Sequence, residues 1–184
     1  QSNAGIPDAF LAKFDPEGVR LWGTYYGGTA TEDGVTCAVA PDGSVYLAGS
    51  TQSTTGIAFN GHQNERSGNS IDAYLVKFTA DGIRSWGTYY GYNGAEYASS
   101  CAVDLDGNVY LAGGTTSTSN IALNGHQGQF GGGVYDAYLA KFDAQGTRLW
   151  ATYFGGAEAE VGSGTATAPD GSVYLVGNTL STNN

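Results

Sequence analysis

The stretch LWGTYYGG at residues 21–28 returns as SWGTYYGY at residues 85–92 and as LWATYFGG at residues 149–156, each copy 64 residues after the last. The same period extends outward from this aromatic segment. Asp8, Asp72 and Asp136 open the segments DAFLAKF, DAYLVKF and DAYLAKF, and PDGSVYLAG, DLDGNVYLAG and PDGSVYLVG keep the same spacing. A repeat of this length decides the architecture of a chain. The units span residues 8–71, 72–135 and, in part, 136–184.

Each unit reads as four short strands, which in the first complete set cover residues 35–40, 44–50, 73–79 and 83–91. The connections APDGS, DPEGV and TADGI are short and place Gly where a hairpin needs a positive φ. No segment shows a helical stripe. Leu21, Trp22, Tyr25 and Tyr26 point to both faces of their strand, as a strand packed between two neighbours requires. The sequence therefore predicts an all-β fold, a β-propeller built of four-stranded antiparallel blades, about three per chain.

The order of the strands predicts how the chain ends. The segments GVTCAVA and SVYLAGS are expected to be the inner strands of a blade, and AYLVKF with IRSWGTYYG the outer ones. The chain then begins with two outer strands and finishes with two inner strands. Two copies placed head to tail would form a homodimer that closes a six-bladed ring. Further blades from a longer parent protein are the alternative.

Composition and charge limit the classes of partner. The formal net charge is -10, which argues against nucleic acid or an anionic membrane surface, because both require a basic patch. No apolar run has the roughly 18 residues of a membrane span. The first residues, Gln1 to Ala4, resemble the remnant of an expression tag, which leaves residues 5–184 as the propeller repeat domain.

Three glutamates are the candidate site. Glu32, Glu96 and Glu160 recur 64 residues apart in the connection that leads into an inner strand, where propeller loops open around the central channel. A ring of carboxylates there suits a hard cation such as Ca²⁺. The same carboxylates could act as acid or base in a hydrolase or lyase. The competing interpretation is that each glutamate only caps its own loop. The Asp-Gly turns lack the spacing of a calcium-binding EF-hand loop.

The other chemically distinctive residues are interpreted as framework. Lys13, Lys77 and Lys141 share one strand position and need partners, for which Asp8, Asp72 and Asp136 are the candidates. His62 and His126 lie in NGHQ segments without metal-ligand spacing and are expected to pack within their loops. Cys37 and Cys101 are one repeat apart, so two buried thiols are expected rather than a disulfide.

At this level of detail the chain resembles the bacterial β-propeller repeats called SBBP repeats. The resemblance rests on the Asp-Ala-aromatic openings, the Tyr-aromatic-Gly-Gly endings and the Asp-Gly-x-Val-Tyr hairpins, and it covers nearly all of residues 5–184. Tyr92 departs from it by replacing the second Gly, and the third repeat stops within its connecting loop. The resemblance implies a secreted or cell-surface bacterial protein and brings no catalytic residue set.

The function expected from these observations is a non-catalytic extracellular scaffold or binding module. The segments at residues 51–71 and 115–135 contain the parts of the repeat that differ most, such as NERSGNS against GQFGGGV. Loops on a rigid scaffold are where proteins usually carry binding residues. We therefore expect these loop faces to contact a glycan or a protein.

Overall fold

The computed structural model describes residues 7–68 and 70–182, so the expected tag remnant at residues 1–4 lies outside the described residues. Strands make up the regular structure of this part of the chain, and no helix occurs in it. The strands are β1 (Ala9–Phe14), β2 (Arg20–Tyr26), β3 (Glu32–Val39), β4 (Val45–Thr51), β5 (Asp72–Phe78), β6 (Arg84–Tyr90), β7 (Glu96–Val103), β8 (Val109–Thr115), β9 (Asp136–Phe142), β10 (Arg148–Phe154), β11 (Glu160–Thr167) and β12 (Val173–Thr179).

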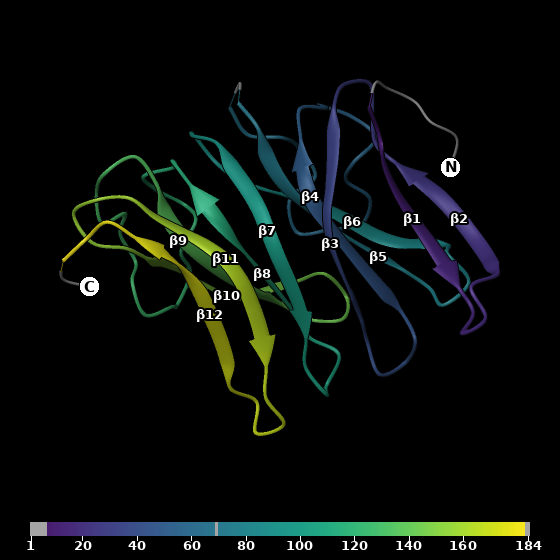
Figure 1. The fold of residues 1–184 in the computed structure, drawn as a ribbon. Coiled ribbons are helices and arrows are strands. Elements are labelled where there is room, and N and C mark those ends of the chain that lie inside the picture. The colour runs from purple at the N-terminus through teal and green to yellow at the C-terminus, as the bar shows by residue number, and fades with distance from the viewer. Residues whose placement is uncertain (1–6, 69, 183–184) are drawn as a thin grey trace.

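These strands form two complete blades and two half-blades, all antiparallel. The complete blades have the orders β3-β4-β5-β6 and β7-β8-β9-β10, and the half-blades are β1-β2 and β11-β12. Figure 1 shows them side by side, with β1-β2 at one end of the molecule and β11-β12 at the other. The predicted all-β architecture of four-stranded repeated units is confirmed.

Local sequence explains the strand boundaries. Gly43 and Gly82 adopt φ values of 81° and 80°, and each donates its N–H to the carbonyl three residues earlier, which closes the tight turns between strands. Most predicted boundaries hold within one residue. The exception is β3, which starts at Glu32 because that residue pairs with Thr51, with a bulge between Gly34 and Thr36.

The middle aromatic segment lies between blades, with residues 86–90 of β6 buried, whereas most residues of its equivalents in β2 and β10 are exposed or half-buried. All seven residues of β5 and all seven of β8 are buried. Tyr26 of the first half-blade contacts Tyr74 of the next blade, with ring centroids 5.1 Å apart. Strand β7 contacts both β3 and β11, and these three strands form the inner side of the blade row. The core is therefore a series of layers between blades.

Position in the row changes the burial of equivalent residues. Trp86 in the middle is buried, whereas Trp22 and Trp150 are half-buried. Both cysteines are free, as predicted, but only Cys101 is buried; Cys37 is exposed because it lies on the first complete blade, where no inner strand covers its side. The expectation of two buried thiols is corrected in this respect.

Candidate functional site

The three predicted glutamates do not form an open ring. Each one begins an inner strand and is almost fully buried in its own blade. The carboxylate of Glu32 accepts hydrogen bonds from Thr51 Oγ1 at 2.6 Å and from the backbone N–H of Gly28 at 2.7 Å. Glu96 and Glu160 repeat this arrangement with Thr115, Tyr92, Thr179 and Gly156. These glutamates therefore join the end of an outer strand to the next inner strand.

This geometry favours the loop-capping interpretation over the two chemical ones. Among the described residues, no group of three His, Cys, Asp or Glu side chains is placed to hold a metal ion. The carboxylates are enclosed and already hydrogen-bonded, so they are not placed to reach a substrate in the propeller mouth either. The roles of Glu32, Glu96 and Glu160 in Ca²⁺ binding or acid–base chemistry therefore stay predictions, whereas their capping hydrogen bonds are present in all three repeats.

A second carboxylate lies beside each glutamate. A Cβ built on Gly91 would stand 2.4 Å from Glu96 Oε2 and 2.7 Å from Asp72 Cγ, so the two carboxyl groups converge on this glycine. Gly27 and Gly155 have the same surroundings in their own repeats. The first glycine of the aromatic segment is therefore required for space, since any side chain would collide with the pair.

Burial and mutual repulsion shift the protonation of this pair. Burial raises the pKa of Asp72 to about 7, the hydrogen bond from the Ser67 N–H opposes the rise, and the negative charge of Glu96 adds to it. Arg66 is the nearby positive charge that acts in the opposite direction. Burial also raises the pKa of Glu96. Like charges at one buried site favour retention of a proton.

We expect Asp72→Asn to stabilise the protein above neutral pH. Because the folded-state pKa of Asp72 is raised from 3.8 to about 7, the folded protein binds more protons than the unfolded chain between these values. Ionisation of Asp72 therefore lowers the free energy of unfolding as the pH rises between these two values. Asparagine imitates the protonated acid, so the melting temperature should rise by a few degrees at about pH 8 and change little at about pH 4.

The control for this prediction is Asp81→Asn, which removes an exposed carboxylate from the turn between β5 and β6. Melting curves of both variants and the unmodified chain across this pH range are the measurement. If the melting temperatures of the Asp72 variant and of the unmodified chain depend on pH in the same way, the raised pKa of Asp72 is contradicted.

The predicted lysine partners are wrong. Lys77 Nζ lies 3.7 Å from Asp42 Oδ2, and Lys141 Nζ lies 3.2 Å from Asp104 Oδ2. Asp72 precedes Lys77 by five strand residues, a separation of about 17 Å. Lys77 and Lys141 also lie over the rings of Tyr46 and Tyr110. Asp72 and Asp136 accept hydrogen bonds from the long loops instead.

The two long loops, at residues 52–71 and 116–135, have the same supporting contacts. Gln63 donates its N–H to Thr88 Oγ1 at 2.7 Å, accepts the Gly91 N–H at 3.2 Å and donates Nε2 to Asp72 Oδ2 at 3.3 Å. The second loop repeats these three contacts through Gln127, with distances of 2.8, 3.1 and 3.3 Å. Each loop also pairs with the outermost strand of its blade, at Phe59 and Leu123. The same hydrogen bonds and strand pairing therefore hold both loops in place. We call this shared part of each loop its frame.

The loops differ where they close. In the first loop Arg66 Nη1 donates to the carbonyls of Gln52 and Ser70, at 3.0 and 2.6 Å. At the equivalent position of the second loop, Phe130 packs its ring against Tyr153, with centroids 6.1 Å apart. Two chemically different tips are therefore displayed on one repeated frame.

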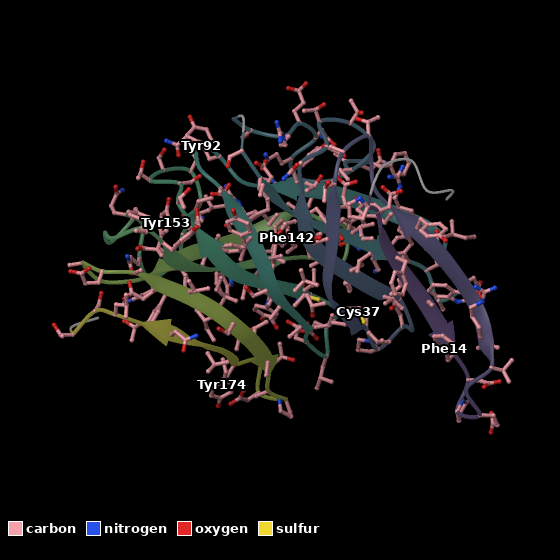
Figure 2. The ribbon with its side chains drawn as sticks, turned by 45° about the horizontal axis from the view of Figure 1, so that its top comes forward. Phe14, Cys37, Tyr92, Phe142, Tyr153 and Tyr174 are labelled. Carbon is pink, nitrogen blue, oxygen red and sulfur yellow. The ribbon has the colours of Figure 1, made fainter. Side chains whose placement is uncertain are left out.

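A cleft of about 240 Å³ lies between these loops. His62, Gln63 and Ser67 line it from the first loop, and Asn120 and Ile121 line it from the second. The remaining lining residues are Tyr90, Gly91, Tyr92 and Arg148. Figure 2 shows Tyr92 at the upper edge of the molecule. Its side chain is 39% exposed, and it stands where the other repeats have Gly28 and Gly156.

The protonation of His62 and the hydrogen bonds of Arg148 determine which charged groups the cleft presents. Partial desolvation lowers the pKa of His62, and the positive charge of Arg148 acts in the same direction, so the imidazole is neutral at pH 7. Arg148 Nη1 donates to the carbonyls of Asn120 and Ile121 at 3.3 and 3.1 Å. The His62 ring contacts Phe142 of the next blade, with ring centroids 6.2 Å apart, in agreement with a packing role, although both His62 and His126 are exposed. The cleft thus offers an aromatic ring, a guanidinium group and neutral polar groups.

The sequence did not identify this cleft as a site. Tyr92 was visible only as a departure from the repeat, and that departure is the signal that could have found it. Arg148 shares its repeat position with Arg20 and Arg84, and only the folded chain shows that it binds the carbonyls of the second loop and lines the cleft.

Comparisons with known proteins agree with a propeller-like repeat protein. The chain is 31% identical over 159 residues to the "Regulatory protein FlaEY" of Caulobacter vibrioides, covering 84% of the chain and 16% of that protein. It is 26% identical over 166 residues to the "Uncharacterized WD repeat-containing protein L264" of Acanthamoeba polyphaga mimivirus, covering 83% of the chain and 12% of that protein. The chain thus spans less than a fifth of either relative. A comparison with models of protein families finds no match, so the SBBP resemblance stays a prediction.

Within the described residues, no helix is long and apolar enough to cross a membrane.

Proposed function

We propose that the chain is a non-catalytic scaffold of propeller blades that binds a partner protein through its loop face. The observation that carries this proposal is the pair of long loops with identical frames and different tips. A packed scaffold that holds variable loops is a common arrangement for recognition. The regulatory protein and the WD-repeat protein among the relatives support a protein partner.

Tyr92 is the residue we expect to contribute most to this binding. It is an exposed ring at the mouth of the cleft between the loops, next to Arg148. Tyrosine and arginine are enriched among residues that dominate protein interfaces. The two tips, at residues 64–68 and 128–132, would then set which partner is bound.

Tyr92→Gly tests the proposal with little risk to the fold, because glycine is the residue of the other two repeats at this position. We expect the affinity for a captured partner protein to fall by about tenfold or more, which is the usual effect of removing an aromatic anchor. The measurement is quantitative mass spectrometry of host proteins retained by the immobilised chain, followed by titration of the enriched protein.

The matched control is Ile83→Asp, an equally drastic change in the turn between β5 and β6, away from the loop face. A variant with the two tips exchanged keeps both frames and should lose the same partner. Retention of that partner by both the Tyr92 and the exchange variants would show that the loop face is not its binding site.

A surface glycan is the second candidate ligand. An exposed tyrosine ring beside Ser67, Asn120 and His62 combines a stacking surface with hydrogen-bonding groups, which suits a sugar. Binding of the labelled chain to immobilised glycans, lost in Tyr92→Gly, would favour this ligand over a protein. We also propose, from the SBBP resemblance alone, that the parent protein is secreted or displayed on a bacterial surface. Digestion by protease added outside intact cells tests that location.

A further inference from the structure

A cluster of three aromatic rings recurs between successive blades. In the first joint, Tyr26 contacts Tyr74 and Phe78 of the next blade, with centroids 5.1 and 6.0 Å apart. In the second joint, Tyr90 contacts Tyr138 and Phe142 at 5.1 and 5.9 Å. All six rings are buried.

The repeat contains the rings for a third cluster, but they lie at opposite ends of the molecule. By the 64-residue period, the residue equivalent to Tyr26 and Tyr90 is Phe154, which is 45% exposed. The residues equivalent to the other two rings are Phe10 and Phe14, which are 70% and 57% exposed. The two positions that hold tyrosine in the closed joints are both phenylalanine here. The ends therefore carry matching apolar surfaces.

A contact between a tryptophan and a glycine also recurs between blades, and the two residues for its third copy lie at opposite ends of the chain. Trp86 lies against Gly146 of the next blade and donates Nε1–H to the Ala144 carbonyl at 3.0 Å. Trp22 has the same contacts with Gly82 and Ala80. Trp150 is the third tryptophan, and Gly18, whose φ of +83° matches the other two glycines, has no atom within 4 Å of its Cβ position. Gly18 is thus shaped to receive a tryptophan.

The free strand edges are complementary in register as well. In the complete blades β4 pairs with β5 and β8 pairs with β9, with Tyr46 opposite Lys77 and Tyr110 opposite Lys141. The same register applied to β12 and β1 places Tyr174 opposite Lys13. Asp170 then takes the place of Asp42, which pairs with Lys77. Figure 2 shows Tyr174 and Phe14 on opposite sides of the molecule, and β1 and β12 belong to separate sheets within one copy.

We propose that two copies of this chain join end to end, β12 of each pairing with β1 of the other, to close a six-bladed ring. Each copy contributes two complete blades and two half-blades, and each joint completes one blade. Closed propellers have about four to eight blades, so two copies reach this range, whereas one copy or three do not. The ring buries both exposed aromatic surfaces and leaves no strand edge of β1 or β12 unpaired.

The first test is the mass of the chain in solution. Light scattering at micromolar concentration should give twice the chain mass of 19.0 kDa. A folded monomer, a trimer or a mixture of larger species would overturn the ring.

Phe14→Asp should convert the dimer into a folded monomer, because its ring is exposed in the single copy and buried only in the joint. The control is Ile83→Asp: Ile83 is 66% exposed although its blade has neighbours on both sides, so this variant should remain dimeric. The reactivity of Cys37 gives an independent measure of dimer formation, because this residue faces the joint. Its thiol should react with a thiol reagent faster in the Phe14 variant. A Phe14 variant that stays dimeric would overturn the proposal, and circular dichroism verifies that it is folded.

Cysteine cross-linking tests the register. On a Cys37→Ser background, Lys13→Cys with Tyr174→Cys should form a disulfide between copies under mild oxidation, because directly opposed strand residues lie within disulfide range. Lys13→Cys with Val176→Cys is shifted by about 7 Å along the strand and should not. Burial raises the pKa of the remaining Cys101 to about 12, which keeps that thiol unreactive. Equal cross-linking of the two pairs, or none of the first, would overturn the pairing.

Discussion

Replacing Trp86 by alanine should lower the free energy of unfolding by about 3–5 kcal/mol, the range for a buried aromatic side chain. Trp86 packs between the two complete blades. Its ring is 4% exposed and rests on Gly146, and its Nε1–H is bonded to the Ala144 carbonyl. The variant loses this packing, leaves a cavity between layers and removes the shorter of two hydrogen bonds to the Ala144 carbonyl, which also accepts from Lys77 Nζ at 3.4 Å.

Chemical denaturation followed by circular dichroism, at one protein concentration for all variants, measures the effect. Trp86→Phe should lose less, because most of the ring is retained and the hydrogen bond contributes only about 1 kcal/mol. The surface control is Leu105→Ala, at a side chain that is 71% exposed, where a change within about 0.5 kcal/mol is expected. A Trp86→Ala loss as small as this control would mean that the blades do not depend on the aromatic layer.

Glu96→Ala should lower the free energy of unfolding by about 2–6 kcal/mol, since each buried donor left unpaired costs about 1–3 kcal/mol. The donors are Thr115 Oγ1, at 2.6 Å, and the Tyr92 N–H, at 3.0 Å. The methyl group of alanine replaces neither bond. The connection between the two blades and the position of Tyr92 in the cleft both depend on this carboxylate.

Glu96→Gln separates hydrogen bonding from charge. Glutamine keeps one acceptor for Thr115 and removes the negative charge that faces Asp72, so it should cost less than alanine, and least above neutral pH. The same denaturation measurements at two pH values provide the test. Equal losses for Gln and Ala at both pH values would show that the side chain acts through packing alone.

The strands and blades were predictable because their determinants are local. A hairpin needs glycine at a fixed position, and a strand between two layers needs apolar residues on both faces. Every 64-residue unit meets both requirements, so the first and last residues of strands such as β4 and β5 were predicted to within one residue. The exposed ends of the row followed from the same strand order.

The partners of the polar residues were not predictable. Lys141 binds Asp104, whose equivalents in the other repeats are Ala40 and Ala168, so no repeat rule leads to it. Asp72 faces a loop glutamine and a glutamate from the next strand pair rather than the lysine of its own strand. Side-chain partners depend on which segments the fold brings together, and spacing along the chain does not contain that information.

The sequence by itself determined the repeat, the strands within it and their order, because backbone hydrogen bonding and apolar alternation act over a few residues. Only the tertiary structure decided what each repeated residue does. Phe142 is fully buried and Phe14 is 57% exposed, although they hold the same position in their repeats. Burial is conferred by the neighbouring blade, which covers Phe142 and does not cover Phe14 in this structure.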